Sequence, residues 1–143
     1  MNVVEFRVER RRRGDLACLN LYVDGRDLGG LATQAELPYA TAAGYPRLAE
    51  GYEGLSAESV RWPSRHFLGA PVRDWFEDGD TAMVDACEAC GLCAPLTAVV
   101  AVEAATVTWR RFRKAHYEDW TLDALGPYMF DRTQYEALRA TLS

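Results

Sequence analysis

Three cysteines lie close together in the second half of the sequence. Cys87, Cys90 and Cys93 are separated from one another by two residues each. This spacing lets a turn direct two or three thiolates at one centre, as in tetrahedral zinc sites. The pattern therefore suggests a metal site at this turn, with zinc as its cofactor.

A tetrahedral zinc ion bound there needs a fourth ligand from another part of the chain. Cys18, His66 and His116 are the residues that could supply it. Zinc ribbons and iron–sulfur modules usually carry a second pair of cysteines or a fourth cysteine nearby, and this sequence has neither. Two other interpretations therefore stay open: a redox-active thiol pair, and small cysteines that are simply buried.

The two histidines are the other candidates for chemistry. A Cys/His hydrolase needs an imidazole beside a thiolate and a third group to orient it, and His66 and His116 are the only imidazoles available. His66 and its neighbour Arg65 are the first candidates for a small-molecule enzyme site. The sequence contains no phosphate loop, dinucleotide fingerprint, serine elbow or His-Glu-x-x-His pattern, so it leans away from an enzyme.

Charged segments provide a second class of candidate. The run of four arginines at residues 10–13 is expected in an exposed turn, and the acidic stretch 74–88 on the surface. Residues 109–114 mix arginines with aromatic residues, but on a regular strand Arg110 would face away from Arg111 and Arg113. These charges are therefore not expected to share one surface.

The elements that position these residues follow from hydrophobic patterning. Residues 2–9 and 16–24 alternate apolar and polar side chains, which predicts a hairpin. Further strands are expected at residues 81–86, 96–103, 106–112 and 128–131. A terminal helix is expected to begin at Asp131 or Arg132, because Tyr135, Leu138 and Leu142 fall on one helical face.

Residues 33–69 lack a clear period and are rich in proline, glycine and tyrosine. A long, irregular, aromatic-rich segment is expected there, either as a binding surface or as a cover for one sheet face. Residues 71–77 are expected to form a short helical turn with Trp75 and Phe76 facing inward. A chain of 143 residues with few helices and no repeat predicts one α+β domain, residues 1–143, with a mainly antiparallel sheet and the C-terminal helix packed on it.

Charge and hydropathy restrict the location and the partners. Sixteen basic and twenty-one acidic residues give a net charge of −5, which argues against nucleic acid as the partner. The sequence shows no stretch long and apolar enough for a membrane span and no secretory signal pattern, so a cytoplasmic protein without a membrane partner is expected.

Several segments resemble a family of small bacterial proteins that has no assigned biochemical function. They are VDGRDL at 23–28, PSRHFLG at 63–69, the cysteine turn followed by Pro95 and Leu96, and VTWRRFRKAH at 107–116 followed by Trp120 and YMFD at 128–131. The resemblance spans most of the chain. It implies a shared fold and no particular reaction.

Three functions are consistent with these residues. The favoured one is a small binding or regulatory module without catalysis, whose partner is a protein or a small molecule. The second is a zinc or redox-active thiol site at the cysteine turn. The third is a small-molecule enzyme with a pocket near His66, between the sheet and residues 33–69.

Overall fold

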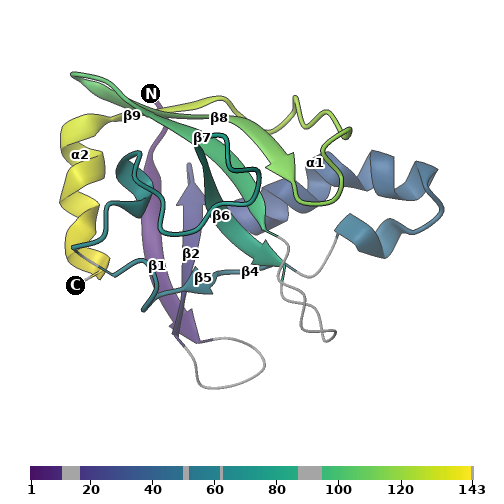
Figure 1. The fold of residues 1–143 in the computed structure, drawn as a ribbon, viewed down its shortest axis with the longest axis horizontal. Coiled ribbons are helices and arrows are strands. Elements are labelled where there is room, and N and C mark those ends of the chain that lie inside the picture. The colour runs from purple at the N-terminus through teal and green to yellow at the C-terminus, as the bar shows by residue number, and fades with distance from the viewer. Residues whose placement is uncertain (11–16, 50–51, 62, 87–94, 143) are drawn as a thin grey trace.

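Alternating apolar residues near the N-terminus form the first hairpin of the computed structural model (Figure 1). β1 (Val4–Arg10) pairs antiparallel with β2 (Ala17–Val23). Val4 and Phe6 are buried, whereas the Val8 side chain, nearer the end of β1, is 47% exposed. The predicted hairpin is confirmed.

The structure describes residues 1–10, 17–49, 52–61, 63–86 and 95–142. Most of the arginine run at 10–13 therefore lies outside the described residues, and so does the cysteine turn. None of the helices in the described ranges is long and apolar enough to cross a membrane.

A helix occupies the beginning of the segment expected to be irregular. α1 (Leu28–Ala42) starts at Asp27, whose carboxylate accepts a hydrogen bond of 3.3 Å from the Gly30 N–H. Side chains at every fourth position form its buried face: Leu28, Ala32, Glu36 and Ala40. The expectation of an irregular segment over 33–69 is thus wrong up to residue 42, because burial of this face outweighs the weak helix propensity of its glycines and Pro38.

The rest of that segment consists of short elements joined by loops. They are η1 (Pro46–Ala49), β4 (Tyr52–Glu53), β5 (Leu55–Ser56) and η2 (His66–Leu68). β5 pairs with β2 and β4 pairs with β6, so the chain passes from one sheet to the other at Gly54. A side chain there would not fit, because a Cβ on Gly54 would lie 2.4 Å from the Leu19 carbonyl oxygen.

Two antiparallel sheets are present in the described part of the chain. The first has the order β1-β2-β3, where β3 is Arg26–Asp27, and β5 also pairs with β2. The second has the order β4-β6-β7-β8-β9, formed with β6 (Asp80–Ala86), β7 (Leu96–Val102), β8 (Thr106–Lys114) and β9 (Tyr128–Asp131). The strands expected over 81–86, 96–103, 106–112 and 128–131 are confirmed.

The segment before β6 differs from its prediction. Residues 71–79 form bends rather than a helical turn, and Trp75 is 37% exposed instead of facing inward. The backbone N–H groups of Trp75 and Phe76 donate hydrogen bonds to the buried carboxylate of Asp80 rather than to carbonyl groups of a helical turn.

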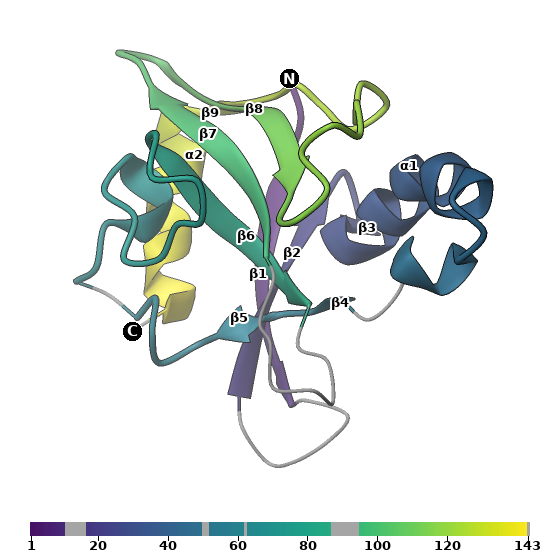
Figure 2. The ribbon, with the colours of Figure 1, turned by 45° about the vertical axis from the view of Figure 1, so that its right-hand side comes forward.

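The chain ends in the predicted helix. α2 (Arg132–Ala137) continues into η3 (Leu138–Leu142), and the Asp131 carboxylate caps it by accepting from the Gln134 N–H at 2.9 Å. Tyr135 lies on the buried face of this helix, and its hydroxyl accepts a hydrogen bond from Trp109 on β8. α1 and α2 lie at opposite ends of the fold with the strands between them (Figure 2). One hydrophobic core joins both sheets and both helices, which supports a single α+β domain.

Candidate functional site

The basic stretch of β8 does not alternate regularly. The register between β7 and β8 shifts between Thr97 and Val99, and Arg111 has a φ of 56°. A bulge of this kind inserts one extra residue and changes which way the following side chains point. Trp109 and Phe112 are consequently both buried, three positions apart, with two exposed arginines between them.

All three arginines of this stretch therefore face outward on one surface. Arg110 and Arg111 are exposed, and the Arg113 side chain, which is 13% exposed, lies beside them. The expectation that Arg110 would point away from the other two is wrong, because it assumed a strand without a bulge. The bulge thus brings the three positive charges to one side of β8, whereas strict alternation would place Arg110 on the other side.

An open groove of about 400 Å³ runs beside these arginines. Arg110, Arg111 and Arg113 line it from β8, and residues between 118 and 127 line it from the connection to β9. This groove, with its three arginines, is called the arginine groove below. It is the candidate functional site of the protein.

Aromatic contacts with α1 hold the far side of the arginine groove. Trp120 is buried and stacks between Tyr39 and Tyr117, at centroid distances of 5.8 and 4.5 Å. The Tyr39 hydroxyl donates a hydrogen bond of 2.6 Å to the Thr121 carbonyl oxygen. The segment 118–127 is thus anchored to the rest of the protein.

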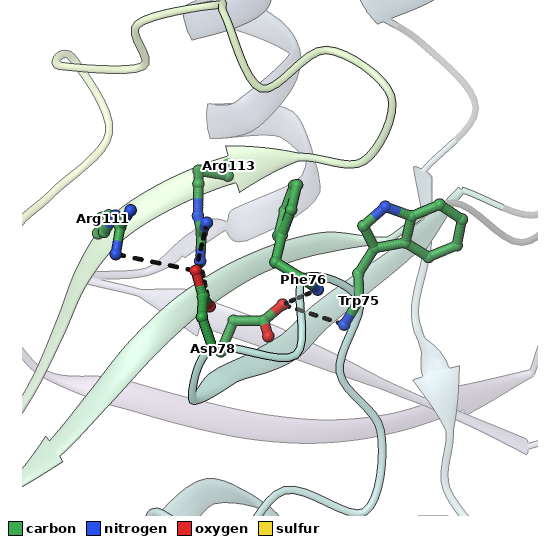
Figure 3. A network of polar contacts seen from close by, with 6 residues as sticks. Trp75, Phe76, Asp78, Arg111 and Arg113 are labelled. Atoms are coloured by element: carbon green, nitrogen blue, oxygen red, sulfur yellow. Dashed lines mark hydrogen bonds and ion pairs between the residues drawn. The ribbon is translucent and has the colours of Figure 1, made fainter.

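One carboxylate of the protein already neutralises part of the positive charge of the arginine groove. Asp78 accepts hydrogen bonds of 2.9 and 2.8 Å from the two terminal nitrogens of Arg113, and lies 3.9 Å from Arg111 (Figure 3). The hydrogen bonds from Arg113 are the largest cause that holds the pKa of Asp78 below its usual range. The Arg113 guanidinium also lies over the Phe76 ring, 4.1 Å from its centre.

The loop that presents Asp78 is fixed by Asp80. The Asp80 side chain is fully buried, and one carboxylate oxygen accepts from the Trp75 and Phe76 N–H groups at 3.0 and 3.1 Å. In Figure 3 these two bonds hold the loop so that Phe76 and Asp78 meet the arginines while the Trp75 ring points away from them. The Trp75 ring contacts the edge of His116, with 4.9 Å between the ring centres.

Positive charge in the arginine groove exceeds what Asp78 neutralises. Arg110 has no polar partner among the described residues, and Arg111 has only its 3.9 Å contact. Glu118 and Asp123 line the opposite side of the groove. The groove is therefore positive along β8 and acidic along its other border.

His66 lies away from this groove and is enclosed. It is 1% exposed, its Nε2 is 2.7 Å from the Ala82 carbonyl oxygen, and its Nδ1 accepts from the Val72 N–H at 3.1 Å. Burial first, and the nearby Arg73 charge as well, lower the pKa of His66. Both ring nitrogens are thus engaged with the backbone, while the adjacent Arg65 is exposed.

The other candidates for the fourth metal ligand lie apart from each other. His116 is exposed and rests on Trp75, and Cys18 is buried on β2. Cys87, Cys90 and Cys93 lie outside the described residues. Within the described ranges, no three histidine, cysteine or acidic side chains are grouped so as to hold a metal ion. The metal and thiol interpretations stay predictions.

A buried ion pair near the same strand was not expected from the sequence. Lys114 Nζ lies 2.7 Å from Glu36 Oε1, 2.7 Å from the Leu48 carbonyl oxygen and 3.3 Å from the Tyr52 hydroxyl. Tyr52 donates a further hydrogen bond to Glu36. Burial raises the pKa of Glu36, and Lys114 opposes that effect. The cluster ties α1 to the end of β8, one residue beyond Arg113.

The sequence did contain one sign of the arginine groove. Buried residues on a regular strand are spaced by two, but Trp109 and Phe112 are spaced by three, which indicates a bulge with two polar residues facing out.

The chain was also compared with family models, with curated proteins and with solved structures, and none of the three comparisons gives a match.

Proposed function

We propose that this protein is a binding module without catalysis, and that the arginine groove takes the carboxylate or phosphate groups of its ligand. The observation that carries the proposal is the convergence of Arg110, Arg111 and Arg113 on one groove through the bulge in β8. Arginine presents a planar fork of donors that matches both kinds of oxyanion.

The charges favour a ligand with more than one negative group. An exposed ion pair contributes only about 0–1 kcal/mol, so a single carboxylate would be held weakly. Arg110 and Arg111 are both exposed, and neither donates a hydrogen bond to the Asp78 carboxylate, from which Arg111 lies 3.9 Å away. Two or more acidic groups on one ligand would therefore engage these arginines together.

Citrate and pyrophosphate are suitable probes for this function. Titration in low-salt buffer, followed by amide NMR shifts, is expected to perturb residues 110–113 and 118–127. The double variant Arg110→Gln and Arg111→Gln is expected to lose these shifts, because it removes the two exposed guanidinium groups.

A charge-matched control is available elsewhere on the surface. Arg47 and Arg61 are exposed and lie outside the groove. The double variant Arg47→Gln and Arg61→Gln changes the net charge by the same amount and should leave the shifts in place. Shifts that are absent in the parent protein, or that disappear equally in both double variants, would contradict the proposal.

A further inference from the structure

Among the described residues, no strand lies beside part of the β8 edge that borders the arginine groove. β9 pairs with β8 only from Thr106 to Trp109, where Tyr128 is the last partner. Residues 110–114 have no strand on that side in the described part of the chain, and no backbone hydrogen bond joins them to residues 118–127. The unpaired stretch and the groove coincide.

An unpaired strand edge is a template for another extended chain. Its backbone groups can hydrogen bond to an added strand, while side chains at alternate positions of that strand determine specificity. Arg110 and Arg113 lie opposite Val99 and Thr97, which are two residues apart on β7, so the two arginines share one face of the sheet. An added strand would bring its own alternate side chains beside them.

We propose that the arginine groove receives an extended acidic segment of a partner protein, which adds to β8 as an edge strand and places acidic side chains at alternate positions beside Arg110 and Arg113. This proposal rests on the function proposed above and names the partner for that site. Backbone pairing supplies the general affinity, and the arginines select acidic segments.

The borders of the groove favour a peptide over a nucleic acid. Glu118 and Asp123 line its far side, and the whole protein carries a net charge of −5. A nucleic acid carries a phosphate at every nucleotide and would be repelled by that acidic border. A peptide strand needs negative side chains on one face alone.

Asp78 provides a test of how the acidic segment engages Arg113. Because Asp78 already binds both terminal nitrogens of Arg113, an incoming carboxylate competes with it. The Asp78→Asn variant is expected to bind an acidic peptide about threefold to tenfold more tightly. Asp74, which is exposed on the same loop, gives the matched control: Asp74→Asn should leave the affinity unchanged.

The experiment uses a capped six-residue peptide that alternates glutamate and threonine, with fluorescence anisotropy for affinity and amide NMR for location. Two further peptides carry N-methyl groups, one on its glutamate amides and one on its threonine amides. Each has the same charge but cannot donate backbone hydrogen bonds along one edge. We expect one of the two to bind at least about tenfold more weakly and the other to retain affinity.

The outcomes separate this proposal from the function on which it rests. Equal binding of all three peptides would overturn strand addition and leave the groove as a site for acidic groups. Failure of the peptides together with citrate and pyrophosphate would overturn both proposals. Binding of single-stranded oligothymidylate at residues 110–113, with none of the peptides binding, would overturn the peptide in favour of a nucleic acid.

Discussion

The imidazole of His66 is held in its neutral form by its surroundings. It is buried, it hydrogen bonds to backbone groups of β6 and of the loop that precedes β6, and burial lowers its pKa from the usual 6.5. The unfolded chain therefore takes up a proton at His66 at a higher pH than the folded protein does. Protons consequently favour the unfolded state as the pH falls below about 6.5.

Stability should thus decrease between pH 7.5 and pH 5.5. The measurement is the free energy of unfolding by urea at both pH values. The His66→Gln variant should lose most of this dependence, and His116→Gln should retain it, because the His116 side chain is exposed. Asp24 and Asp78 have lowered pKa values and act only at more acidic pH. An unchanged slope in His66→Gln would refute this account.

The pair formed by Lys114 and Glu36 gives a second prediction for single residues. Both side chains are buried, so Lys114→Met would leave the Glu36 carboxylate without its cation and should cost about 3–5 kcal/mol of stability. Combined with Glu36→Leu, the loss should shrink to about 1–2 kcal/mol or less, because no buried charge remains. A double-mutant cycle by urea unfolding measures this coupling. Additive losses would contradict it.

At the level of elements, β8 and α2 are joined through one side chain. Trp109 is fully buried, its ring contacts the edges of Phe130 and Tyr135, and its Nε1–H donates to the Tyr135 hydroxyl at 3.0 Å. The same hydroxyl donates to the Phe67 carbonyl oxygen at 2.7 Å. Trp109 therefore connects the sheet, the C-terminal helix and η2.

Truncation of this ring should be severe. Trp109→Ala is expected to cost about 3–5 kcal/mol, because it removes a large buried surface and leaves a cavity. Trp109→Phe should cost less, since it retains most of the packing and loses the hydrogen bond to Tyr135. Thermal or urea unfolding of both variants checks the order. A stable Trp109→Ala protein would mean that the ring is not part of the core.

The hairpins and the C-terminal helix could be predicted because their patterns are local. Phe6 and Leu21 alternate with polar neighbours, and Asp131 stands where a helix cap belongs. α1 could not, since its buried face includes Glu36. That carboxylate is buried because it meets Lys114, 78 residues further along the chain, and no local pattern shows such a partner.

The arginine groove was missed for a related reason. Strict alternation separates Arg110 from Arg111, and only a bulge turns both toward solvent. The three-residue spacing between Trp109 and Phe112 indicates this bulge, but the second side of the groove comes from residues 118–127, which have no regular pattern. Their position depends on the contact of Trp120 with Tyr39 on α1.

At the level of the whole molecule, the two sheets are joined where the chain crosses at Gly54. A Cβ there would meet both the Leu19 carbonyl and the Asn20 side chain at 2.4 Å. Gly54→Ala should therefore force the sheets apart and cost about 1–3 kcal/mol or more. Gly30→Ala is the control, because Gly30 is exposed in the first turn of α1 and a Cβ there would lie 3.8 Å from its nearest neighbour atom.

The control substitution should have the opposite sign. Alanine favours the helix over glycine by about 0.5–1 kcal/mol, so Gly30→Ala is expected to raise stability slightly. Both free energies come from urea unfolding under the same conditions. Equal effects of the two substitutions would show that the crossing at Gly54 has room for a side chain.

The buried Lys114 is the only lysine in the chain, and the remaining basic side chains other than the two histidines are arginines. A guanidinium stays charged at every physiological pH and is not a target of lysine acetylation. The positive charge of the arginine groove is therefore permanent. Control of its occupancy through a change of charge therefore has to act on the acidic side: on the carboxylates of Asp78, Glu118 and Asp123, or on the charge that the partner itself carries.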